Sequence, residues 1–435
     1  MLQQASAAVP DSTGMAQRLK AVVIGSIGNL VEWYDFYAYA AFSLYFAASF
    51  FPKDDPVTQQ LNAAIIFALA FFARPIGAWM FGHLADRYGR RVSLILSVSM
   101  MCFGSLLIAA APTYAMAGIW APVLLSLARI IQGISLGGEY GASASYMSEV
   151  SDPRRRGFYC SFLYVTLIGG QLCAVLVLML LQKLFLDDAQ LRAWGWRIPF
   201  VIGALLAVVA ALMRRNLHET DAFVAARSAP QPPFWAFLRY PKEVFLVVGL
   251  TMGGTAAFYT YTTYMQKFLK LTLKLSDDQT TLVTAGSLLF AIVLQPIYGA
   301  LSDLIGRKPM LVGFGVLGTI FTVPVMTALQ GTTDPWVAFA LICAAWLYVA
   351  GYTSINAIVK AELFPTSVRA TGIAVPYALA VSVFGGTAEP IALAFKQDGH
   401  ETWFFYYLTA VIAVSLVFYI YMRDTGKVSA MDRHA

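Results

Sequence analysis

The chain has 435 residues, of which 59% are hydrophobic and only 12% are charged, and its mean hydropathy is +0.66. A soluble domain carries roughly 25% charged residues, so the composition excludes an ordinary soluble protein and indicates many membrane spans. The formal charge of +6 is typical of cationic cytoplasmic loops and does not require a nucleic-acid partner.

Residues 1–20 are mostly polar and hold no apolar core of a secretory signal peptide, so we expect a cytoplasmic N-terminal tail. Apolar runs of ~20 residues follow, each long enough to cross the ~30 Å bilayer core as a helix. The first six form a predicted six-helix bundle over residues 21–213. They lie near residues 21–50, 60–83, 92–111, 117–148, 158–182 and 196–213.

Residues 214–242 are polar and include Pro230, Pro232 and Pro233, a composition typical of a linker. We expect this linker in the cytoplasm, followed by a second six-helix bundle over residues 243–422 and a cytoplasmic tail over 423–435. Basic residues are denser in the loops on the side of both termini, which predicts that side as cytoplasmic. The second six spans lie near residues 243–268, 279–302, 310–329, 336–359, 370–395 and 402–422.

A charged turn occurs twice in the chain. The run GHLADRYGRR at residues 82–91 joins the second and third predicted spans, and the weaker copy GALSDLIGRK occupies residues 299–308. Asp86 and Asp303 are half a chain length apart, and Glu149 and Glu362 are separated by nearly the same interval. The second half of the chain thus repeats two features of the first half in the same order. This repeat predicts an all-α membrane protein with twelve helices in two pseudo-symmetric bundles.

The glycines of these turns allow close helix approach, and the acids can accept hydrogen bonds from a helix N-terminus or pair with arginines. We therefore predict a cytoplasmic latch that forms in one conformation and breaks in another. The alternative is that the positive charges only set the topology. The predicted latch residues are Gly82, Asp86, Arg87, Gly89, Arg90, Arg91, Glu149, Asp303, Arg307, Glu362 and Arg369.

These turns and the run ARIIQG at residues 128–133 resemble the major facilitator superfamily, and GNLVEWYDFY at 28–37 is similar to its metabolite:proton symporter branch. Residues 137–141, 146–150, 164–172 and 262–267 are similar to the members that carry the dicarboxylate 2-oxoglutarate. The resemblance implies alternating access, proton coupling and a bacterial inner membrane, with both termini in the cytoplasm.

Ionisable side chains inside the predicted spans are few, and each costs roughly 2.5–3.5 kcal/mol at mid-depth. Arg74 and Arg129 can each bind a carboxylate through two parallel hydrogen bonds, and a dicarboxylate needs two such anchors. The alternative is a structural ion pair with Glu32, Asp35 or Glu139.

Glu32 and Asp35 share one face of the first span, where a buried carboxyl that changes its protonation would couple proton and substrate. A fixed ion pair is the alternative for both, and Glu139 is a further candidate proton site. Several polar residues complete the predicted binding site, although helix packing, interfacial anchoring and lysine snorkelling remain open for them. The predicted substrate-binding residues are Arg74, Arg129, Gln132, Gln171, Tyr261, Tyr264, Lys267, Tyr352 and Asn356.

The four cysteines lack the spacing of metal ligands, and no nucleophile–base motif or phosphate-binding loop is present. We therefore expect no enzyme, metal or cofactor. The expected partners are a small anionic metabolite, a proton and the lipid bilayer, without nucleic acid and with the chain as a monomer. A symporter of shikimate, citrate or a zwitterionic osmolyte, and a non-transporting nutrient sensor, remain as alternatives.

Overall fold

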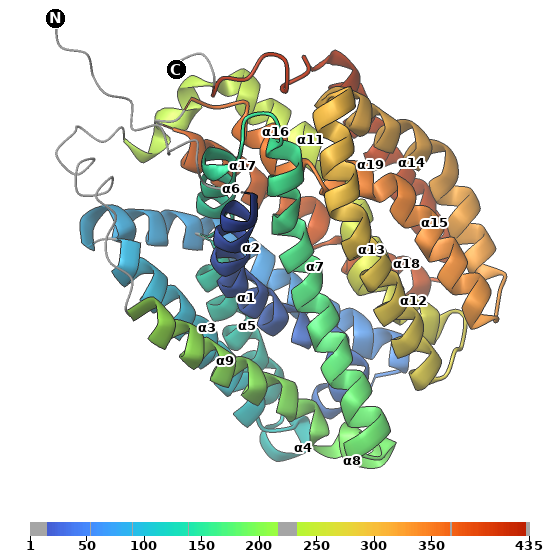
Figure 1. The fold of residues 1–435 in the computed structure, drawn as a ribbon. Helices are drawn as coiled ribbons and strands as arrows, with labels where there is room; N and C mark the ends of the chain where they lie inside the picture. The colour runs from blue at the N-terminus through green and yellow to red at the C-terminus, as the bar shows by residue number, and fades with distance from the viewer. Residues whose placement is uncertain are drawn as a thin grey trace, which may run out of the picture.

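The computed structural model describes residues 15–52, 54–88, 90–137, 139–215, 233–365 and 368–431, which are almost entirely helical and contain no β-strand. The helices of the first half gather on one side of the molecule and those of the second half on the other (Figure 1). The all-α class predicted from the hydropathy is confirmed.

The first half begins with two long helices and continues with shorter ones. A π-helical segment, Leu181–Phe185, extends α7, and a 3₁₀ turn, Gly195–Arg197, leads into α9. The helices are α1 (Met15–Phe50), α2 (Pro56–Tyr88), α3 (Arg90–Ala110), α4 (Tyr114–Ala117), α5 (Trp120–Gly137), α6 (Glu139–Val150), α7 (Arg156–Leu180), α8 (Asp188–Ala193) and α9 (Ile198–Arg215).

The second half follows a 3₁₀ turn, Phe234–Arg239, and has π-helical segments at Thr260–Tyr264 and Val381–Gly385. Ser276 and Gln279 form a capping box that starts α13, and Asp334 caps α15. The helices are α11 (Pro241–Tyr259), α12 (Met265–Leu271), α13 (Asp277–Ile305), α14 (Arg307–Gln330), α15 (Pro335–Thr353), α16 (Asn356–Ala361), α17 (Arg369–Ala380), α18 (Ala388–Gln397) and α19 (Glu401–Tyr421).

Within the described ranges, nine helical segments are long and apolar enough to cross a membrane, and two shorter apolar helices, Ile95–Ala110 and Gly195–Val209, coincide with the third and sixth predicted spans. The first predicted span lies on α1, where the side chains of the first fourteen residues are not described. The fold therefore agrees with the twelve predicted spans.

Helix α2 approaches α5 closely because α5 presents glycines to it. A Cβ on Gly133 would lie 2.0 Å from the carbonyl oxygen of Ala70, and a Cβ on Gly137 would lie 2.1 Å from that of Arg74. Only glycine fits at these two positions, so the two helices can pack closely. The contact fixes the height and rotation of the α2 turn that carries Arg74.

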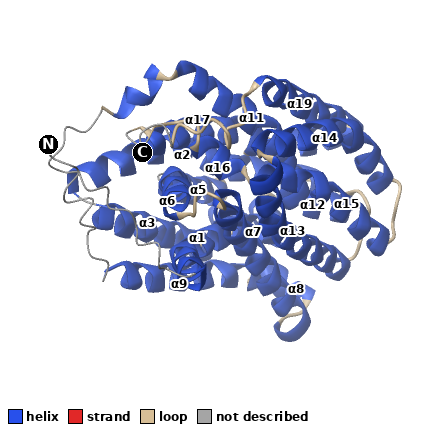
Figure 2. Ribbon diagram, turned by 45° about the horizontal axis from the view of Figure 1, so that its top comes forward, coloured by secondary structure: helices blue, strands red, loops and turns tan. Residues whose placement is uncertain are grey.

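The two halves meet along α7 and α13, which pack side by side across their boundary (Figure 2). At the end predicted to face outward, Gln266 and Lys267 of α12 donate hydrogen bonds to the carbonyl oxygens of Ala41 and Ala40 in α1. At the predicted cytoplasmic end, Asp303 accepts hydrogen bonds from the first turn of α7. The halves are therefore in contact at both ends, with a cavity between those contacts.

Candidate substrate-binding cavity

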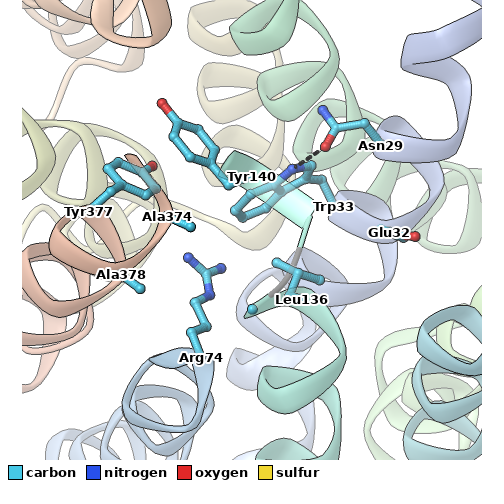
Figure 3. Close-up of a pocket in the computed structure, with 10 residues that line it drawn as sticks. Asn29, Glu32, Trp33, Arg74, Leu136, Tyr140, Ala374, Tyr377 and Ala378 are labelled. Carbon is cyan, nitrogen blue, oxygen red and sulfur yellow. Dashed lines mark hydrogen bonds between the residues drawn. The ribbon is translucent and has the colours of Figure 1, made fainter. Parts of the chain in front are cut away.

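A cavity lies between the two halves, near the middle of α1 and α2, at the junction of α5 and α6, and facing the C-terminal half of α17. Figure 3 shows Arg74 pointing into it between Trp33 and Tyr377. Its walls combine aromatic rings, small aliphatic side chains and a few polar groups, which is the usual make-up of a small-molecule site. The lining residues are Asn29, Glu32, Trp33, Arg74, Leu136, Gly137, Tyr140, Ala374, Tyr377 and Ala378.

Arg74 is the cation of this cavity. Only 4% of the residue is exposed, and its Nε and Nη2 have no hydrogen-bond partner among the described residues. Its guanidinium carbon lies 5.0, 4.8 and 4.5 Å from the ring centroids of Trp33, Phe36 and Phe71. Ring faces stabilise a guanidinium but accept no strong hydrogen bonds, so this group retains donors for an incoming anion.

The cavity wall is held by contacts within and between the halves. Trp33 Nε1 donates to Asn29 Oδ1 at 2.9 Å, and Asn29 Nδ2 donates to Thr166 Oγ1 at 2.8 Å. On the other side, the rings of Tyr140 and Tyr377 stack with centroids 3.8 Å apart. Because Tyr140 belongs to the first half and Tyr377 to the second, this stack closes the cavity between them.

A polar cluster adjoins the two stacked tyrosines. Asn356 Nδ2 donates to Tyr140 Oη at 3.0 Å and to Tyr164 Oη at 2.7 Å, so a predicted binding residue of the second half is bound to the first. Lys360, one turn along α16, donates to Asn356 Oδ1. Lys360 directly follows the predicted span 336–359, where a lysine is typical of a cytoplasmic loop, so the sequence pattern does not mark it as a binding residue.

Arg129 lies in a second buried cluster, inside the first half. Its Nη1 donates to Gln132 Oε1 at 2.6 Å, while Gln132 Nε2 donates to Ser105 Oγ at 2.8 Å and approaches Asp35 Oδ2 at 3.5 Å. Ser105 also donates to Asp35 Oδ2, and Asp35 Oδ1 has no hydrogen-bond partner among the described residues. The structure thus brings the predicted Arg129, Gln132 and Asp35 together, but not with Arg74.

Both arginines contact the ring of Phe36. Its centroid is 4.8 Å from the guanidinium carbon of Arg74 and 4.5 Å from that of Arg129. Asp35, the adjacent residue on α1, carries the carboxyl of the second cluster. A rearrangement around Asp35 can therefore displace Arg74, because Asp35 and Phe36 are adjacent on α1 and Phe36 contacts Arg74. Glu32, the other candidate proton site of α1, is buried and lines the cavity itself.

The remaining predicted binding residues are buried but do not line the cavity. Tyr261 Oη is 2.8 Å from Tyr348 Oη, Tyr264 Oη donates to Glu401 at 2.9 Å, and Tyr352 Oη is 3.4 Å from Thr255 Oγ1. Gln171 is buried in α7, and its Oε1 has no hydrogen-bond partner among the described residues.

Lys267 is fully buried. Its Nζ lies 3.3 Å from Glu389 Oε1 and donates to Ala40 O at 2.7 Å. Lys267 therefore does not snorkel to the membrane surface: it forms an ion pair within the second half, and its hydrogen bond to Ala40 joins the halves. The π-helical segment Val381–Gly385 precedes Glu389 in the chain.

The second copy of the predicted latch is assembled. Asp303 accepts hydrogen bonds from the backbone N–H groups of Gly157 and Phe158 at 2.8 and 2.9 Å, so it caps α7 across the boundary between the halves. Arg307 Nη1 donates to Asp303 Oδ1 at 2.7 Å, and its Nη2 lies 3.7 Å from Glu362 Oε1.

Glu149 pairs across the same boundary with Arg369, whose Nη1 lies 2.6 Å from Glu149 Oε1. Burial raises the pKa of the Glu362 carboxyl, an effect that the nearby Arg307 opposes, and Thr425 donates to Glu362 at 2.6 Å. The side chains of Asp86, Arg87, Arg90, Arg91 and Glu139, together with Gly82 and Gly89, lie outside the described residues.

In the parts of the chain that the structure describes, no group of three or more His, Cys, Asp or Glu residues could hold a metal ion. The polar groups of the cavity are instead a guanidinium, phenols, amides and one carboxyl, which suit an organic anion.

Comparisons with known proteins agree with this architecture. The family model "Sugar (and other) transporter" matches residues 21–231, and the model "Major Facilitator Superfamily" matches residues 259–431. The alpha-ketoglutarate permease of Escherichia coli (strain K12) is 49% identical over 416 residues, which cover 96% of each chain.

The chain belongs to the major facilitator superfamily.

A citrate-proton symporter of Klebsiella pneumoniae is 31% identical and covers 95% of this chain and 94% of its own. Among solved structures, the proton:xylose symporter XylE bound to 6-bromo-6-deoxy-D-glucose superposes with a TM-score of 0.76 at 17% identity, covering 96% of this chain and 98% of its own. That likeness shows the major facilitator fold. The chain is therefore a multi-pass membrane transporter of the proton-symporter type, and members of this superfamily are not enzymes.

Proposed function

We propose that the chain imports a small dicarboxylate, 2-oxoglutarate, together with a proton across the bacterial inner membrane. The environment of Arg74 is the main support for this substrate class, because a buried guanidinium with unpartnered N–H groups in the cavity favours a carboxylate. The 49% identical alpha-ketoglutarate permease supports 2-oxoglutarate among the dicarboxylates. In this proposal both termini lie in the cytoplasm, and the two bundles span residues 21–213 and 243–422, joined by a cytoplasmic linker.

Arg74 would bind one carboxylate of the substrate through two parallel hydrogen bonds. Trp33, Phe36 and Phe71 surround its guanidinium and keep water from it, which strengthens the attraction to an anion. The bond between Trp33 and Asn29 fixes the indole that forms part of this surface. The substrate would thus meet a charge whose position is already set before binding.

Asp35 is the proton carrier in this proposal. Its carboxyl is buried with one unpartnered oxygen, and Gln132 links it to Arg129. Protonation of Asp35 would remove the charge that faces Gln132 and let this cluster rearrange. Because Phe36 contacts both arginines, the rearrangement would shift α1 against Arg74 and couple the proton to the anion. Arg129 then acts within the coupling cluster and not as a direct ligand.

Alternating access follows from the contacts at the two ends. Opening outward would break the bonds from Gln266 and Lys267 to α1. Opening to the cytoplasm would break the Asp303 cap on α7 and the pair between Glu149 and Arg369. The cavity between these contacts would therefore open to one side at a time. Each monomer contains a complete cavity, so transport would need no second copy.

Uptake of radiolabelled 2-oxoglutarate into proteoliposomes tests the proposal. We expect accumulation when the outside is more acidic, and loss of accumulation when a protonophore collapses the gradient. Excess citrate, shikimate and glycine betaine, added separately, test the other substrates. Gradient-driven uptake of one of these without uptake of 2-oxoglutarate would overturn the substrate. Binding without flux of any solute would favour a sensor, and uptake that ignores the gradient would remove proton coupling.

A further inference from the structure

Lys360 is a buried cation that the transport scheme above does not use. It lies on the short helix α16, which starts after the break between α15 and α16, and only 1% of it is exposed. Its Nζ donates to Asn356 Oδ1 and lies 4.1 Å from the ring centroid of Tyr377. The rings of Tyr140 and Tyr352 are 5.8 and 5.9 Å away.

Aromatic faces and one amide oxygen are weak compensation for an ammonium group taken out of water. Burying an unpaired charge is costly unless an anion accompanies it. No carboxylate of the described side chains lies within 4.0 Å of Lys360 Nζ, whereas Lys267 and Arg369 have carboxylate partners. A lysine ammonium has three donors, and the structure assigns one of them, to Asn356.

Lys360 stands beside the cavity that holds Arg74. Tyr377 and Tyr140 line that cavity together with Arg74, and Figure 3 shows Tyr377 on the side opposite Trp33. The ammonium of Lys360 lies against both tyrosine rings. Arg74 comes from the first half of the chain and Lys360 from the second. Two buried cations, one from each half, therefore lie beside the same pair of stacked tyrosines.

We propose that Lys360 binds the second carboxylate of the substrate and so makes the site selective for dicarboxylates. This inference rests on the proposed function and adds the residue that reads the second charge. When the Tyr140–Tyr377 stack parts, one carboxylate contacts Arg74 and the other contacts Lys360, with Asn356 as a neighbouring amide. A monoanion leaves one buried cation without a partner, and the site therefore rejects it.

Two monocarboxylates test this arrangement because each replaces one carboxylate of 2-oxoglutarate with a methyl group. They are 2-oxopentanoate and 4-oxopentanoate. Their affinities and that of 2-oxoglutarate are measured by calorimetry on purified wild type, Lys360→Met and Arg74→Met in detergent. We expect Lys360→Met to weaken 2-oxoglutarate binding about 100-fold and to leave one of the two monocarboxylates within about threefold of wild type. Arg74→Met should spare the other one.

Two results would overturn the inference. One is an unchanged affinity of Lys360→Met for 2-oxoglutarate, and the other is an equal loss for all three ligands, which indicates a structural role. Lys360→Arg keeps the charge and should retain selectivity for the dicarboxylate. This variant therefore distinguishes loss of the positive charge from misfolding as the cause of weaker binding in Lys360→Met. Glu139→Gln combined with Lys360→Met tests an internal partner, because recovery of 2-oxoglutarate binding in that double variant would assign Lys360 to Glu139.

The wild-type measurement separates this inference from the proposed function. If wild type binds succinate but not 2-oxoglutarate, the proposed substrate is wrong. The affinities of wild type and Lys360→Met for succinate and butyrate then test the role of Lys360. If wild type binds no dicarboxylate, both proposals fail. If it binds 2-oxoglutarate and Lys360→Met binds it equally well, only the inference about Lys360 fails.

Discussion

Lys267 of the second half donates a 2.7 Å hydrogen bond to the backbone oxygen of Ala40 in the first half. Its neighbour Gln266 does the same to Ala41 at 3.1 Å, and Glu389 neutralises the lysine from 3.3 Å. Three side chains of the second half thus converge where α1 would have to move for a solute to enter from outside. The ion pair is buried, so each partner depends on the other.

Replacing Lys267 with Met should destabilise the protein, because it leaves the Glu389 carboxylate buried without its cation. Removing one partner of a buried pair costs about 3–5 kcal/mol, which would appear as a lower melting temperature in detergent. The double variant Lys267→Met/Glu389→Gln leaves no unpaired charge and should recover most of the loss. A double variant no more stable than the single one would show that the pair is not the cause.

Arg74→Lys should weaken 2-oxoglutarate binding by about 10–100-fold although the charge is kept. The lysine cannot form the two parallel hydrogen bonds of a guanidinium, and it packs differently on Trp33 and Phe36. Binding to purified protein measures the effect. The conservative change Arg239→Lys, outside the cavity, is the matched control and should have no effect. Normal affinity in Arg74→Lys would show that only the positive charge of Arg74 matters and that its paired hydrogen bonds do not.

Asp35→Asn should separate exchange from accumulation. An amide at this position cannot take up and release a proton, so gradient-driven accumulation in proteoliposomes should stop, whereas exchange of internal and external 2-oxoglutarate should continue. Glu32→Gln is the parallel variant, because Glu32 lines the cavity three residues earlier. If Glu32→Gln gives this behaviour and Asp35→Asn does not, Glu32 is the proton carrier.

Asp303→Asn should open the predicted cytoplasmic end more often, since it weakens the cap on the N–H groups of Gly157 and Phe158. The readout is labelling of a cysteine introduced at Ser161, which faces Gly299 near this contact, in a background without the four native cysteines. We expect labelling several times faster than in the Asp303 parent. The control Asp334→Asn makes the same change at another helix cap and should not change labelling. Equal rates in both variants would argue against the latch.

Gly137→Ala should lower substrate affinity without touching the substrate. The added Cβ would meet the Arg74 carbonyl at 2.1 Å, so α2 must shift and move Arg74 with it. A loss of about tenfold in affinity for 2-oxoglutarate is expected from such a displacement. Gly313→Ala in α14 is the control, because its Cβ would meet no atom within 4 Å. An unchanged affinity in Gly137→Ala would contradict this packing argument.

Much of the architecture follows from the sequence by simple physics. Runs of ~20 apolar residues predict spans because a helix must cover the bilayer core. The position of Arg74 at a cavity also follows from the sequence, since an arginine inside a span needs an anionic partner or a water-filled cavity.

Other parts depend on tertiary packing that no local pattern encodes. Arg129 satisfies the same rule as Arg74, yet it does not line the cavity and is bonded to Gln132 inside the first half. Lys360 lies just past a predicted span and is buried because α16 packs against Tyr140 of the first half and Tyr377 of the second. Glu149 pairs with Arg369, which lies 220 positions further along the chain, a contact that no local pattern encodes.

The cavity draws unequally on the two halves: a guanidinium, an indole, an amide and a carboxyl of the first half face a phenol and two small side chains of the second. Two copies of one ancestral unit would begin with identical walls, and their divergence would make the lining asymmetric. In the proposed role, such a lining would distinguish the two ends of an asymmetric substrate. Neither half expressed alone would contain the complete binding site.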